Sequence, residues 1–167
     1  KCILFADDTN LFASCKSRRE LYIKVREELG KLADWFAHNR LSLNYAKTEF
    51  IDFTKPAMVS SKDNDVLKIE NLIQKVSESK FLGVLIDKDI SWQGHINKVL
   101  ARVRQTIGLI GRARGFMSGP QLLLLYNTMV LPHLQYCLLN WGNFQGDGNM
   151  RLRVGLLSLQ KSLVRII

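Results

Sequence analysis

A long segment without charged side chains constrains the fold of this chain more than any other feature. From Gly115 to Gly146 there is no Asp, Glu, Lys or Arg, and the segment includes four consecutive leucines, Leu122–Leu125. Such a segment either crosses a membrane, which takes about 20 mainly apolar residues, or lies in a protein core. Polar residues and a proline interrupt it: Gln121, Asn127, Thr128, Pro132, His133, Gln135 and Asn140. We therefore predict a buried helix pair and no association with a membrane.

Basic residues are concentrated in the last part of the chain. The net charge of the 167 residues is 24 − 15 = +9. Residues 1–56 carry 10 basic and 8 acidic side chains, residues 57–93 carry 5 and 6, and residues 94–167 carry 9 and 1. The last part therefore has a net charge of 9 − 1 = +8, and contacts with nucleic acid are expected there first.

Composition excludes several classes of protein. The chain is 47% hydrophobic and 23% charged, which is typical of a globular domain and excludes intrinsic disorder. Its 3 cysteines are odd in number and form no CxxC pair. A reducing, intracellular compartment is the simpler interpretation of that pattern.

Hydrophobic spacing predicts a mixed α and β first part. Residues 2–6 and 9–13 are apolar runs around Asp7 and Asp8, which predicts a hairpin with an acidic tip. Ser17, with a glutamate at the capping-box spacing, opens a helix that should reach about residue 38. Further strands are expected at 41–44 and 48–53, as a hairpin over 66–69 and 72–76, and as one continuous strand at 81–86.

The second part is predicted to be a basic three-helix unit. Apolar residues at helical spacing run from Ile96 to Ile110, Ser118 and Pro120 mark a second helix start, and a last helix should begin at about residue 149. Pro132 should kink or end the second helix. The expected fold class is α+β, with one domain over residues 1–92 and another over 93–167.

Asp7 and Asp8 are the first candidates for chemistry. Adjacent carboxylates repel one another unless a cation lies between them, and Mg²⁺ prefers oxygen ligands. Two such ions can stabilise the attacking and leaving oxygens of a phosphoryl transfer. The alternative is structural, since Asp is common in turns, where its side chain accepts hydrogen bonds from nearby backbone.

The residues around this pair carry a family resemblance. Phe5-Ala6-Asp7-Asp8 resembles the aromatic-x-Asp-Asp signature of reverse transcriptases. Later segments agree in order and spacing: Leu32-Ala33-Asp34-Trp35-Phe36, Asn39-Arg40-Leu41-Ser42-Leu43-Asn44, Lys47-Thr48, Phe81-Leu82-Gly83-Val84, Ile86-Asp87, Trp92, His95-Ile96, Tyr136-Cys137 and Trp141-Gly142. Together they resemble the C-terminal half of a non-LTR (LINE-type, jockey-like) retrotransposon reverse transcriptase, over nearly the whole chain.

The resemblance implies a partial polymerase palm, of antiparallel strands with a packed helix, followed by an all-α three-helix thumb. Asp7 and Asp8 match the metal-binding pair, for two Mg²⁺ or Mn²⁺ ions in a complete enzyme. Lys47 matches a lysine thought to protonate the leaving pyrophosphate. The matching primer-grip residues are Phe81, Leu82 and Gly83. The basic residues expected to bind nucleic acid are Lys98, Arg102, Arg104, Arg112 and Arg114.

The implied partners are an RNA template, a DNA primer, dNTPs and the upstream fingers and palm of the same polyprotein. A nuclear location follows from the family alone. The family also needs another metal-binding Asp upstream, so we expect this chain by itself to be inactive. Two alternatives remain open: a non-catalytic nucleic-acid-binding remnant, and a helical structural or membrane-associated module around residues 116–146.

Overall fold

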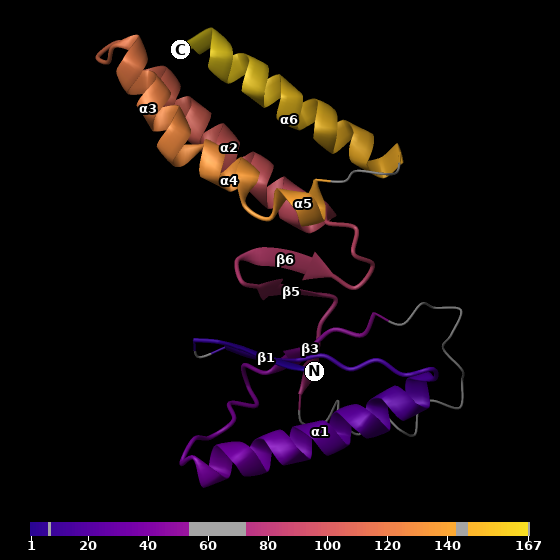
Figure 1. Cartoon of the computed structure of the whole chain (residues 1–167). Helices are drawn as coiled ribbons and strands as arrows, with labels where there is room; N and C mark the ends of the chain where they lie inside the picture. The colour runs from indigo at the N-terminus through magenta and orange to yellow at the C-terminus, as the bar shows by residue number, and fades with distance from the viewer. Residues whose placement is uncertain (7, 54–72, 143–146, 167) are drawn as a thin grey trace. The chain divides into compact units, whose positions relative to one another are not determined.

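The computed structural model describes residues 1–6, 8–53, 73–142 and 147–166 (Figure 1). Helices and short strands are both present, so the predicted α+β class is confirmed. The chain divides into two units, Lys1–Ser77 and Glu78–Ile167. The predicted boundary between residues 92 and 93 falls within the second unit, and the division into palm and thumb stays a prediction.

The first unit begins with the predicted hairpin. Strands β1 (Cys2–Phe5) and β2 (Asp8–Leu11) pair antiparallel, with Cys2 opposite Leu11 and Phe5 opposite Asp8. Helix α1 (Arg18–His38) follows, and the Ser17 hydroxyl caps it by accepting a hydrogen bond from the Glu20 N–H at 3.3 Å. Both elements lie within a few residues of where the sequence predicts them.

Helix α1 ends in a Schellman motif. The Leu41 N–H donates to the Phe36 carbonyl at 2.8 Å, the Arg40 N–H donates to Ala37 at 3.0 Å, and Arg40 has a φ of +58°. This closing turn satisfies carbonyls left unpaired at the helix end. The strand predicted at 41–44 is wrong, because Leu41 completes the helix end and no ladder forms over these residues.

Two strands of two residues each complete the first unit. Strands β3 (Glu49–Phe50) and β4 (Gln74–Lys75) pair in parallel, so the strand predicted over 48–53 is much shorter than expected. The hairpin predicted over 66–69 and 72–76 falls mostly outside the described residues. Its described part contains β4, which pairs with β3. Among the residues of this unit that the structure describes, Tyr22 and Ile73 are the buried members of its core. Val25, Leu29 and Phe50 pack against them.

The second unit begins with another hairpin. Strands β5 (Glu78–Phe81) and β6 (Val84–Asp87) pair antiparallel and enclose a two-residue turn, Leu82-Gly83. The continuous strand predicted over 81–86 is therefore wrong. The apolar run continues through a tight turn, which hydrophobicity alone does not reveal.

Five helices follow this hairpin among the described residues. They are α2 (Gln93–Ala113), α3 (Gly119–Met129), α4 (Leu131–Gln135), α5 (Leu138–Trp141) and α6 (Asp147–Ile166). The three-helix prediction missed α4 and α5, which are short. Pro132 lies in the first turn of α4, so the second helix ends before this proline, and Cys137 takes a φ of +53° before α5.

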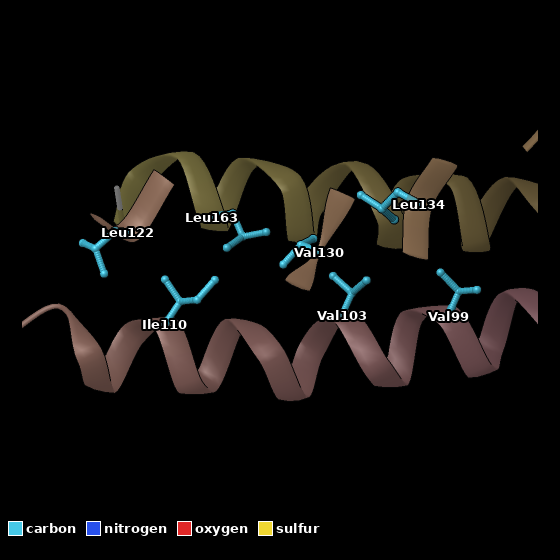
Figure 2. Packing of buried hydrophobic residues seen from close by; sticks show 7 residues of the cluster. All are labelled: Val99, Val103, Ile110, Leu122, Val130, Leu134 and Leu163. Atoms are coloured by element: carbon cyan, nitrogen blue, oxygen red, sulfur yellow. The ribbon is translucent and has the colours of Figure 1, made fainter. Parts of the chain in front are cut away.

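Apolar side chains from several helices form the core of the second unit. Figure 2 shows residues of α2 facing residues of α3, α4 and α6. The buried cluster consists of Val99, Val103, Ile110, Leu122, Val130, Leu134 and Leu163. The uncharged segment is only partly buried, however, since Leu124 is 62% exposed and Leu139 is 95% exposed. The predicted buried helix pair is instead a set of short helices, which bury a few side chains and leave several leucines exposed.

Candidate nucleic-acid interface

Asp8, the second residue of the acidic pair, is the first residue of β2 in the β1–β2 hairpin. It pairs with Phe5, the last residue of β1, and Ala6, which follows Phe5, has a φ of +52°. Asp8 is exposed, whereas Asp7 lies outside the described residues. The exposed Asp8 carboxylate offers oxygen ligands of the kind that a hard cation prefers. Among the described residues, however, no group of three His, Cys, Asp or Glu side chains is placed to hold a metal ion.

Lys47 lies in a turn that Asn44 organises. The Lys47 N–H donates to the Asn44 carbonyl at 3.1 Å and to its side-chain oxygen at 3.3 Å. The Thr48 hydroxyl donates to the same carbonyl at 2.8 Å. The Lys47 side chain is exposed, which leaves its ammonium free to meet an anion. Within the described part of the chain, no hydrogen bond or ion pair joins Lys47 to Asp8.

The predicted primer-grip residues form the end of β5 and the turn of the second hairpin. Leu82 has a φ of +46° and Gly83 a φ of +88°. Positive φ at both central residues is the signature of a type I′ turn, the form that suits the twist of a two-residue hairpin. Glycine adopts this conformation without strain, whereas leucine does not. The tip therefore carries a residue that the turn itself disfavours.

Asp87 connects this hairpin to α2. Its carboxylate accepts hydrogen bonds from the backbone N–H groups of Asp89, Ser91 and Trp92 at 3.0, 3.0 and 2.9 Å, and from the Ser91 hydroxyl at 3.1 Å. Burial acts to raise the pKa of Asp87, but these hydrogen bonds together outweigh it and hold the pKa below its ordinary value of 3.8. The carboxylate thus fixes the loop from which α2 starts.

The five predicted nucleic-acid-binding residues share one helix and its end. Lys98, Arg102, Arg104 and Arg112 lie on α2, Arg114 follows it, and all five are exposed. Helix α2 contains four basic and no acidic residues. Lys98 and Arg102 are four residues apart and therefore lie one above the other, while Arg104 occupies another flank. A solvated helix face of this kind can neutralise phosphates with little dependence on base sequence.

Sequence reasoning missed the residues that hold the second hairpin against the helices. The Tyr136 hydroxyl donates to the Leu82 carbonyl at 2.6 Å, and the Leu85 N–H donates to His95 Nδ1 at 3.3 Å. The sequence marks Tyr136 and His95 only as residues of the segments that resemble the reverse transcriptase family. Their partners are backbone groups, which leave no trace in side-chain spacing.

No protein-family model matches the sequence, and comparisons with curated proteins and with solved structures give no match. In the described part of the chain, no helix has the length and apolar character needed to cross a membrane.

Proposed function

We propose that this chain is the end of the palm and the thumb of an RNA-directed DNA polymerase of the non-LTR retrotransposon type. The observation that carries the proposal is the pairing of Phe5 with Asp8, the first and last residues of the Phe5-Ala6-Asp7-Asp8 sequence. Phe5 ends one strand and Asp8 begins the next strand of an antiparallel hairpin. A second unit with an exposed basic helix follows it in the chain. An acidic hairpin followed by a basic helical unit suits a polymerase that holds metal ions at one site and phosphates at another.

Each predicted residue has a role in this proposal. Asp7 and Asp8 would hold Mg²⁺ or Mn²⁺, which supplies charge stabilisation to the attacking and leaving oxygens of phosphoryl transfer. Lys47 would give its proton to the leaving pyrophosphate. The turn at Leu82 and Gly83 would contact the primer strand. The exposed cations of α2 would hold the template–primer backbone while the primer 3′-hydroxyl attacks a dNTP in the complete enzyme.

A binding measurement tests the helical part of this proposal. We expect the chain to bind an RNA–DNA primer–template, with an affinity that falls steeply with salt concentration. Each phosphate contact contributes a slope of about −0.9 in log K against log salt. The double variant Arg102→Gln, Arg104→Gln should reduce that slope by about 2. The pair Arg19→Gln, Arg26→Gln, on exposed positions of α1, is the matched control and should leave the slope nearly unchanged.

A non-catalytic nucleic-acid-binding protein is the second candidate, because the exposed cations of α2 do not depend on the acidic pair. Binding of Mn²⁺ separates the two. As a metal site, the hairpin turn should show paramagnetic broadening of the amides around Asp8, and Asp7→Asn should abolish it. If Mn²⁺ broadens no signal there while the duplex still binds, the non-catalytic candidate is favoured.

A further inference from the structure

The tip of the β5–β6 hairpin is fixed to the helices from outside the hairpin. Tyr136, between α4 and α5, donates its hydroxyl to the Leu82 carbonyl at 2.6 Å across 54 residues of sequence. A Cβ atom on Gly83 would lie 3.6 Å from Tyr136 Cε1, so the phenol ring is in van der Waals range of the turn. Tyr136 therefore bonds to the first residue of the turn and lies close beside the second.

Tyr136 is itself held in place. Its carbonyl accepts a hydrogen bond from Trp141 Nε1 at 2.7 Å, and Trp141 is 1% exposed. The Trp141 ring meets His95 edge to face, with ring centroids 5.5 Å apart. His95 Nδ1 in turn accepts a hydrogen bond from the N–H of Leu85, which lies in strand β6 of the hairpin. The contacts form a closed circuit from the turn through α4, α5 and α2 and back to β6.

The turn needs such support because of its sequence. A type I′ turn favours asparagine followed by glycine, and here leucine stands in the first position with a φ of +46°. The hydrogen bond from Tyr136 is made to the carbonyl of that same leucine.

We propose that Tyr136 is a positioning residue that fixes the Leu82-Gly83 turn against the helical unit, so that hairpin and helices present one rigid surface to the primer end. This role rests on the proposed function, in which the turn contacts the primer strand. Tyr136 itself need not touch nucleic acid, and it acts through the conformation of the turn.

Hydrogen exchange in the Tyr136→Phe variant of the full 167-residue chain tests the positioning. We expect the amides of residues 80–85 to exchange about two- to tenfold faster, the range that one hydrogen bond contributes, with the amides of α6 unchanged. Tyr126→Phe, on α3, also removes one phenol hydroxyl and is the matched control. Leu82→Asn, added to Tyr136→Phe, should return exchange toward the original rate, because asparagine suits the turn.

Binding measurements connect this contact to the primer. Tyr136→Phe should weaken binding of a primer–template with a recessed 3′ end several-fold, while a duplex with closed ends binds as before. Unchanged exchange at residues 80–85, faster exchange throughout the helices, or an equal effect of Tyr126→Phe would each overturn the positioning role. Faster exchange in a chain that binds neither duplex would overturn the proposed function and the primer role, but would leave Tyr136 as the residue that fixes the turn.

Discussion

The Tyr22 hydroxyl lies 2.9 Å from Asp52 Oδ2 and donates a hydrogen bond that ties α1 to the segment after β3. Arg18 adds two further hydrogen bonds to the same oxygen, at 3.2 and 3.1 Å, and Lys75 lies 3.6 Å away. The side chains of Arg18 and Asp52 are 7% and 6% exposed. Burial and the bond to Asp52 together raise the pKa of Tyr22 to about 12. This small charged cluster supplements an apolar core that includes the buried residues Tyr22 and Ile73.

Replacing Asp52 with alanine should destabilise the first unit strongly. The change leaves the buried Arg18 guanidinium without its carboxylate, and breaking a buried ion pair in this way costs about 3 kcal/mol or more. Hydrogen exchange of the α1 amides measures the loss. Asp34→Ala, at an exposed position of the same helix, should change exchange little. A variant at Asp52 that leaves α1 as protected as before would contradict the role given to the cluster.

Arg40→Gly should stabilise the first unit. Arg40 occupies the position after the helix where a Schellman motif requires positive φ, and its φ is +58°. A side chain costs about 1 kcal/mol or more in this conformation, and the greater freedom of glycine in the unfolded chain offsets part of that gain. We expect a net gain of about 0.5 kcal/mol, read from thermal unfolding followed by circular dichroism. Arg26→Gly, at an exposed position in the interior of α1, is the control with the opposite sign and should destabilise the helix by about 1 kcal/mol.

The stability of the second unit should fall as the pH drops below 6.5. Burial, with a smaller effect of Lys98, lowers the pKa of His95 below its ordinary value of 6.5. A histidine whose pKa is lower in the folded state contributes its full stability above the unfolded value and loses it as the pH falls toward the folded value. Protonation also turns Nδ1 into a donor that faces the Leu85 N–H, so the hydrogen bond between them is lost.

Exchange of the β6 amides, measured between pH 8 and pH 5 and corrected for the intrinsic rate, checks this prediction. His95→Gln should remove the change in stability between pH 7 and pH 5. His38 and His133 are exposed, and replacing each with glutamine should leave that change in place. A pH profile that His95→Gln does not alter would show that another group titrates in this range.

Local signals predicted part of the fold well. The Ser17 cap, the β1–β2 hairpin and the helix start at Ser118 are features of neighbouring residues, and each is where the sequence places it. The failures have a physical cause as well. An apolar run such as residues 81–86 has the same hydrophobicity whether it continues or turns, and the turn at Leu82 is held by Tyr136, which lies 54 residues away. The sequence pattern does not contain that contact.

The candidate site also contains some residues whose positions the sequence pattern predicts and others whose contacts it does not. The exposed positions of the α2 cations follow from helical periodicity, because the apolar positions on α2 point to the core and leave Lys98 and Arg102 on the outside. The contacts that position the hairpin and the start of α2, at Tyr136, His95 and Asp87, join side chains to backbone. Such contacts depend on the tertiary fold, so no spacing rule finds them.

The 167 residues alone should not extend a primer. Asp7 and Asp8 supply two carboxylates. Mg²⁺ demands near-ideal octahedral geometry with ligands from several groups, so two carboxylates hold two ions poorly. We expect no incorporation of labelled dNTP on an RNA template with a DNA primer, in either Mg²⁺ or Mn²⁺. Primer extension by this chain that Asp7→Asn abolishes, and that Asp34→Asn leaves intact, would show that the chain carries a complete metal site, and the expectation of inactivity would then be wrong.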